Sequence, residues 1–302
     1  MHTVIALILA AGLQQAAAPQ HPADDPADYV KQARRLVANG SHDEALALYQ
    51  KAIEAQPSSF EAHLGAGLVL DLKLQFADAR THLSKALELA PDEAKPQVMN
   101  ALAVSYAFEG NAKEAASFYQ KVFDGQVAES NFVAAAATAN ALGRVYLETG
   151  DVANARRWYQ TGYESARRQP DVSADQLAIW EFRWLHAQAR ISARAGQVDD
   201  SRKQVSAARA LLDRTPALEN ETASWHYLAG YVELYAKNYP KAIELLQAAD
   251  QEDPFVLSLL ARAYEGAGNA DSARNTWALV LKANGHSLQN AFARPMAMQK
   301  TR

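Results

Sequence analysis

Hydrophobic positions in residues 140–160 recur with the spacing of two amphipathic helices that are joined by a Gly-Asp corner. Gly143 and Tyr146 fall on one face of the first predicted helix. Ala155 and Tyr159 share a face of the second, four residues apart. Small residues let two helices approach closely, and the tyrosines fill the space beside them. The pattern therefore predicts a helical hairpin.

The same spacing of glycine, alanine and aromatic residues recurs through residues 28–283, which divide into about seven units. Pro57 and Pro91 close two successive units and are 34 residues apart. The interval between Gly110 and Gly150 is 40 residues, which predicts a longer hairpin around residues 124–125. The fifth unit matches weakly, and its phase depends mainly on Gly196. A recurring period of this length is typical of a repeat array that has no single core.

This spacing resembles the tetratricopeptide repeat, whose pattern is Trp-x2-Leu-Gly-x2-Tyr, then Ala-x3-Phe, then Pro. The resemblance implies an all-α fold: a right-handed α-solenoid of about seven antiparallel helix pairs. It also implies that the first helix of each pair lines a concave groove. Such arrays mostly bind peptides or other proteins, and the resemblance implies no reaction.

Polar residues at the predicted corners are suited to capping helices. A capping box is expected at Ser41-x-x-Glu44, and Asn111, Asp151 and Asn269 are N-cap candidates. The segment 284–302 is interpreted as a cap over the last repeat that ends in a frayed basic tail.

The N-terminus has the pattern of a signal peptide. Residues 4–13 are an apolar run, too short to span a bilayer, and Ala16-x-Ala18 supplies a cleavage pattern. Residues 1–18 are thus predicted to be a signal peptide and 19–27 a linker, which implies an exported chain, periplasmic or secreted, with no transmembrane span after cleavage. The absence of Lys and Arg before the run and Pro19 just after the cut argue against this. The alternative is a disordered or tethering N-terminus on a cytoplasmic chain.

The amino-acid composition limits the partners and the reactions that the chain can be expected to have. The net charge of −4 does not favour nucleic acid as a partner. The chain has no cysteine, which excludes disulfides and thiolate nucleophiles. The eight histidines show no metal-ligand spacing, and no phosphate-binding glycine loop occurs. We therefore expect no catalytic residue, no metal and no cofactor.

Under the repeat resemblance, fixed positions of each first helix face the groove, and here they carry mainly amides, arginines and tyrosines. Guanidinium groups bind carboxylates in a bidentate manner, and amides bond peptide backbone. An acidic segment or a C-terminal carboxylate is the expected ligand, although the lysines of known carboxylate-binding repeats are missing. The alternative is that the arginines form a solvated face paired with nearby acids. The candidate groove residues are Asn100, Asn140, Arg144, Arg183, His186, Arg190, Tyr227, Tyr231 and Arg262.

The aromatic pair Trp180 and Trp184 is interpreted as core packing against the fourth repeat, or alternatively as an aromatic edge of the groove.

Three hypotheses for the function of the chain follow from these sequence patterns. The first is a non-enzymatic scaffold or adaptor that binds a protein or peptide partner. The second is a self-associating structural subunit of a cell-envelope complex. The third, an enzyme, would need a cluster of catalytic side chains that the predicted groove lacks.

Overall fold

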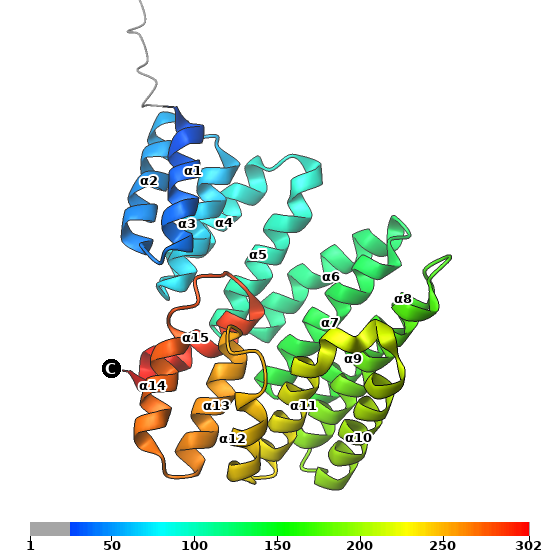
Figure 1. Ribbon diagram of the computed structural model, residues 1–302. Coiled ribbons are helices and arrows are strands. Elements are labelled where there is room, and N and C mark those ends of the chain that lie inside the picture. Colours follow the sequence, from blue (N-terminus) through cyan, green and yellow to red (C-terminus); the bar gives the residue numbers. More distant parts are fainter. Residues whose placement is uncertain (1–24, 302) are drawn as a thin grey trace, which may run out of the picture.

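The structure is a computed structural model that describes residues 25–301, so the predicted signal peptide and most of the linker lie outside the described residues. Its first fourteen α-helices form seven antiparallel pairs (Figure 1). The first four pairs are α1 (Pro26–Ala38) with α2 (His42–Ala55), α3 (Phe60–Leu72) with α4 (Phe76–Leu89), α5 (Lys95–Phe108) with α6 (Ala112–Ala128), and α7 (Phe132–Thr149) with α8 (Val152–Arg167). The other three are α9 (Ala174–Arg194) with α10 (Val198–Arg214), α11 (Thr222–Tyr235) with α12 (Tyr239–Gln247), and α13 (Pro254–Gly266) with α14 (Ala270–Val280). Short 3-10 turns η2 (Asp92–Ala94) and η3 (Pro216–Glu221) precede α5 and α11, and α15 (Leu288–Lys300) ends the fold. The predicted α-solenoid of seven helix pairs is confirmed.

Helix α1 begins inside the segment that the sequence assigns to a linker. Pro26 is its first residue, and the Asp25 carboxylate accepts a hydrogen bond from the Ala27 amide at 2.9 Å. Proline is well tolerated at the first helical position because its missing N–H would have no partner there. Pro26, which the sequence analysis placed in a non-helical linker, is therefore the first residue of α1.

The corner residues behave largely as predicted. Asn111, Asp151 and Asn269 each accept a hydrogen bond from the amide three residues on, which confirms them as N-caps. Ser41 makes no such bond, so the predicted capping box is wrong. The corner glycines have positive φ, the conformation in which a Cβ would be strained; they are Gly40, Gly110, Gly150, Gly196 and Gly268.

The longer middle repeats result from longer helices, not from longer loops. The predicted insertion site at Gly125 lies within α6, and α6 and α7 have 17 and 18 residues. Helix α9 has 21 residues and opens with a capping box between Ser173 and Gln176. The extra turns of α7 and α9 extend the wall that they form on the concave side.

Packing between helices depends on the small residues that the pattern identified. A Cβ added at Gly143 would lie 2.9 Å from the ring of Tyr159, so α7 and α8 can approach this closely only with glycine there. Trp180 is buried with Ala136 and Ala166 of the fourth repeat, which confirms the core-packing interpretation. Trp184 stacks on Tyr163 with ring centroids 5.9 Å apart.

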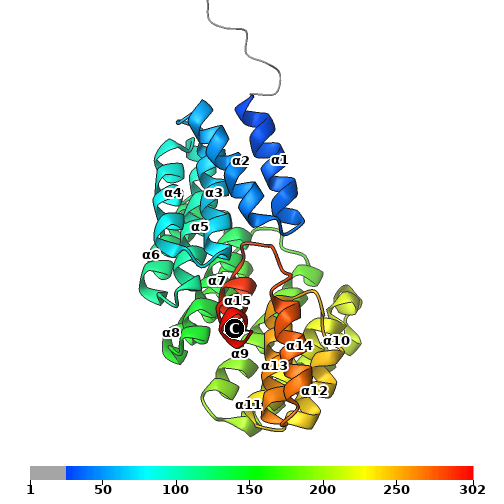
Figure 2. The ribbon, with the colours of Figure 1, turned by 90° about the vertical axis from the view of Figure 1, so that its left-hand side faces the viewer.

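Helix α15 does more than cap the last repeat. Its Ala293 and Ala297 pack with Trp277 of α14, as a cap would. The helix also lies between the last repeats and α5 (Figures 1 and 2). It continues to Lys300, whose ammonium lies 3.0 Å from Glu265, so the predicted frayed end is wrong.

Buried polar contacts fix α15 and the loop before it to the second repeat. The Arg294 guanidinium donates to the backbone carbonyl of Leu72 at 2.6 Å. The fully buried Asp71 carboxylate lies 2.8 Å from His286 Nε2 and accepts a hydrogen bond from Ser105 at 2.9 Å. The contacts of Arg294 and His286 join residues more than two hundred positions apart, and they bring the end of the solenoid back against its second repeat.

Candidate functional site

A cavity of about 530 Å³ lies on the concave side, between α7, α9, the start of α11 and α15. The first helices of the fourth, fifth and sixth repeats provide most of its wall. Leu288 and Gln289 of α15 line it as well, so α15 bounds the site. At this place the concave groove that the sequence predicts is therefore bounded on one side by α15.

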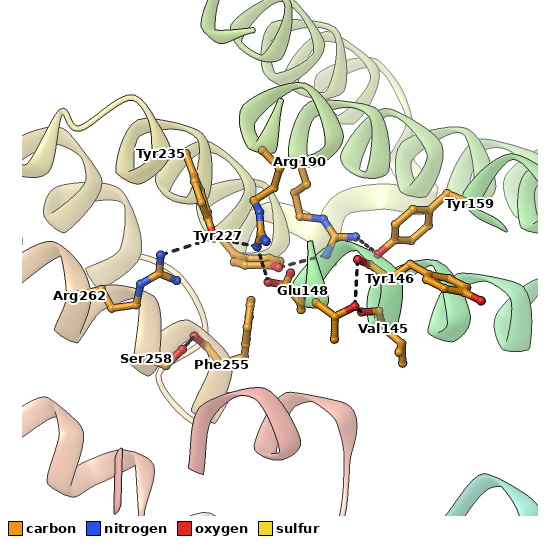
Figure 3. A network of polar contacts seen from close by, with 12 residues as sticks. Val145, Tyr146, Glu148, Tyr159, Arg190, Tyr227, Tyr235, Phe255, Ser258 and Arg262 are labelled. Carbon is orange, nitrogen blue, oxygen red and sulfur yellow. Dashed lines mark hydrogen bonds and ion pairs between the residues drawn. The ribbon is translucent and has the colours of Figure 1, made fainter. Parts of the chain in front are cut away.

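Two arginines give the cavity its cationic side. Arg190 is only 7% exposed, and its guanidinium donates to the hydroxyls of Tyr159 at 2.9 Å and Tyr227 at 3.4 Å (Figure 3). The guanidinium of Arg144 lies 4.5 Å from the ring centroid of Phe255. Nε and Nη2 of Arg144 and Nε of Arg190 are buried and have no acceptor among the described residues. The site therefore holds donors that the fold itself does not use.

A second polar cluster adjoins this one (Figure 3). Arg194 donates to Glu148 at 3.2 Å and to the Tyr235 hydroxyl at 3.0 Å, and Arg262 donates to the same hydroxyl at 3.4 Å. The Glu148 side chain is 6% exposed, and its second oxygen has no partner. Among the described residues, Glu148 pairs with Arg194 alone, and Arg262 donates only to the Tyr235 hydroxyl, so the arginines of this cluster outnumber its carboxylate.

His186 is a neutral member of the site. Its Nε2 lies 3.2 Å from the Ser224 carbonyl oxygen, which can only accept, so Nε2 carries the hydrogen and Nδ1 the lone pair. Burial and the neighbouring Arg190 guanidinium lower the pKa of His186 well below its usual value. Burial likewise raises the pKa of Tyr159 and Tyr227, so both phenols keep their protons at neutral pH.

Two carboxylates also line the cavity. Glu221 ends η3, just before α11, and Asp253 is the N-cap of α13, where it accepts from the amides of Phe255 and Val256. Neither forms an ion pair within residues 25–301, and the same holds for Arg144, Arg183 and Arg190. Charges of both signs thus share one cavity without neutralising each other.

The structure brings most of the predicted groove residues together. Six of them line the cavity: Asn140, Arg144, Arg183, His186, Arg190 and Tyr227. Asn100, Tyr231 and Arg262 do not line it, although Arg262 belongs to the adjoining cluster. The alternative, a solvated arginine face of Arg183, Arg190 and Arg194 paired with nearby acids, fits Arg183 in its exposure but not in its pairing, and fits Arg194 in its ion pair with Glu148. It does not describe the buried Arg190.

Sequence reasoning missed several members of the site. Tyr159 was assigned only a packing role, and Glu148 lies one helical turn after Arg144, a spacing that could have suggested it. Glu221 and Asp253 sit outside the first helices, and α15 arrives from the far end of the chain. No repeat-position rule places such residues at the cavity.

Within residues 25–301, no group of three or more His, Cys, Asp or Glu side chains is arranged to hold a metal ion. None of the described helices combines the length and apolar character that a membrane span requires. The arrangement offers cationic and phenolic donors in a partly enclosed cavity, which suits recognition of an anionic group by hydrogen bonds.

Among solved structures, a tetratricopeptide repeat protein from Parabacteroides merdae is similar with a TM-score of 0.54 and 10% identity, covering 90% of this chain and 98% of that one. Pseudomonas aeruginosa PilF has a TM-score of 0.48 and 16% identity, with 82% and 95% covered. PilW, a widely conserved type IV pilus biogenesis factor, has a TM-score of 0.49 and 15% identity, with 74% and 90% covered. These likenesses concern the fold alone.

No curated protein matches the chain. One tetratricopeptide repeat family model matches residues 30–94 and 186–256, and a second matches residues 136–161 and 254–278. The matched residues include the weak fifth repeat from residue 186 onward and all of the predicted groove residues except Asn100 and Arg183. Since the two models together match more than half of the chain, it belongs to the tetratricopeptide repeat family, whose arrays are scaffolds for protein interaction.

Proposed function

We propose that this chain is a non-catalytic scaffold or adaptor that binds an acidic segment or a free C-terminal carboxylate of a partner protein in the concave cavity. The observation that carries the proposal is the set of unused guanidinium donors of Arg144 and Arg190. A buried donor without an acceptor costs about 1–3 kcal/mol. These nitrogens have almost no exposed surface, so a carboxylate in the cavity would remove that cost once a small side-chain movement brings them to its oxygens.

The position of α15 favours a chain end over a long internal segment. Leu288 and Gln289 bound the cavity, and the buried contacts of Arg294 and His286 hold α15 in place. An extended peptide that ran along the whole concave surface would have to displace this helix. The end of a chain can enter a bounded cavity without doing so.

Self-association finds less support. Among the described residues the exposed large hydrophobic side chains are Val133, Leu177 and Leu279, on three different helices. So few exposed apolar side chains give little area for a docking surface, which an extended apolar patch would mark. The last repeat, which could otherwise stack on another copy, is covered by α15.

The test uses synthetic peptides that differ only in a free or amidated C-terminus, with binding followed by fluorescence anisotropy. The free-acid peptide should bind the wild-type chain more tightly, and the difference should fall as salt is raised. Arg144→Ala should reduce the affinity for the free acid. Arg274→Ala, at a 69% exposed side chain on α14, is the matched control and should leave it unchanged.

Equal affinity for acid and amide peptides at both low and high salt would refute a carboxylate site. Export is a separate part of the proposal and rests on the N-terminal sequence pattern. N-terminal sequencing of the protein from its native host checks it: a chain that starts after residue 18 supports export, and an intact Met1 in the cytoplasmic fraction contradicts it.

A further inference from the structure

The cavity of the proposed function has an anionic side as well as a cationic one. Arg144 and Arg190 come from α7 and α9, whereas Glu221 and Asp253 come from the segments that lead into α11 and α13. Tyr227 of α11 lines the cavity with them, and its hydroxyl accepts a hydrogen bond from Arg190 at 3.4 Å. The two charges are therefore held at different places on one wall.

This separation has an energetic cost in the free protein. Partly buried charges gain stability from a close counterion, and a charge that lacks one keeps its desolvation penalty. No ion pair joins the arginines to Glu221 or Asp253 within the described residues. A ligand that brings a negative group to the arginines and a positive group to the carboxylates would compensate both.

We propose that the ligand's terminal residue carries a positive side chain, so that the cavity takes a protein C-terminus ending in lysine or arginine. This inference rests on the proposed function, in which the terminal carboxylate binds Arg144 and Arg190. The basic side chain of the same residue binds Glu221 and Asp253. Their carboxylates are what gives the cavity its preference for the terminal side chain.

The same charges argue against other anionic ligands. A phosphate group or a run of acidic residues would gain from the arginines, but its further negative charges would be repelled by Glu221 and Asp253. An uncharged terminal residue would leave both carboxylates without a counterion. A terminal basic residue carries one charge of each sign, and groups of both opposite signs line the cavity.

The probe is a fluorescein-labelled pentapeptide, Gly-Ser-Gly-Ala-X, in which X is lysine or the uncharged norleucine, each as free acid and as amide. With the wild-type chain, the lysine acid should bind roughly tenfold more tightly than the norleucine acid, the effect of one additional charge-assisted hydrogen bond. The double variant Glu221→Gln/Asp253→Asn should lose this preference, because neither side chain then carries the charge that attracts the lysine. Asparagine is as good an N-cap as aspartate, so α13 should keep its start.

Each outcome has a distinct meaning. Equal affinity of the wild-type chain for the two free acids overturns this inference and leaves the proposed function standing. A lysine preference that persists in the double variant overturns the assignment to Glu221 and Asp253. If neither free acid binds better than its amide, the proposed function itself fails. Helical circular dichroism and the thermal midpoint of the double variant should match those of the wild type, which confirms that a lost preference reflects the site.

Discussion

Substituting Gly143 with alanine tests how helix packing supports the site. An added Cβ would lie 2.9 Å from Cγ and Cδ2 of Tyr159 and 3.1 Å from Cδ1. Side chains do not approach this closely, so the ring or α8 must shift. The ring is 3% exposed and has little free space in which to move. Its hydroxyl accepts the hydrogen bond from Arg190, so a displaced ring also disturbs the cavity.

Two opposing terms set the size of the effect on stability. Overpacking a well-filled core costs about 1–3 kcal/mol. Alanine is favoured over glycine within a helix by about 0.5–1 kcal/mol. Gly125 in α6 offers the matched control, because a Cβ there meets nothing within 4 Å. Gly125→Ala should therefore gain only the stability that alanine adds to a helix. The free energies of unfolding of the two variants should differ by about the overpacking cost, 1–3 kcal/mol.

The assay is urea unfolding of both variants and the wild type, followed by circular dichroism. Gly143→Ala should unfold at lower urea than the wild type, and Gly125→Ala at slightly higher urea. Gly143→Ala should also bind the free-acid peptide more weakly, while Gly125→Ala binds it normally. Equal stability of the two variants would refute the close contact between Gly143 and Tyr159.

Three further predictions concern other parts of the fold. Lys237 is exposed and has a φ of 60°, so Lys237→Gly should raise the free energy of unfolding by about 0.5–1 kcal/mol in a urea titration, and a loss would contradict the strain at this corner. Because folding lowers the pKa of His186, the unfolded chain takes up a proton that the folded chain excludes as pH falls below 6.5. The free energy of unfolding should therefore decrease as pH falls below 6.5, and it should decrease less steeply in His186→Gln. Identical dependence on pH in the two proteins would show that His186 does not cause the loss. Arg294→Met removes the donors to Leu72, Leu281 and Ala283, and should cost about 2–3 kcal/mol and lengthen the distance between the first and last repeats measured by fluorescence energy transfer. An unchanged distance would show that apolar contacts alone hold α15.

The sequence was sufficient for the repeat architecture because that architecture depends on local rules. Positive φ at Gly110 and Gly150, the Asn111 and Asp151 caps, and the contact of Gly143 with Tyr159 each involve residues close in the chain. Helix propensity, capping and close packing of small residues act over one or two turns, and each repeat contacts mainly its neighbours.

The candidate site was predicted in part for the same reason. Arg144, His186, Arg190 and Tyr227 were found because their repeat positions place them on the inner face of a first helix. Asn100 occupies an equivalent position on α5 yet does not line the cavity. Repeat position gives the face of the solenoid, but it does not tell where along that face a cavity forms.

The sequence by itself determined the helix pairs, their corners and the inward-facing side chains, since all of these follow from short-range periodicity. The tertiary structure alone decided that α15 returns to the second repeat through Arg294 and His286 and turns an open groove into a bounded cavity. It also decided that Glu221 and Asp253 share that cavity with the arginines. Contacts between residues two hundred positions apart depend on the accumulated curvature of all the repeats between them, which no local pattern encodes.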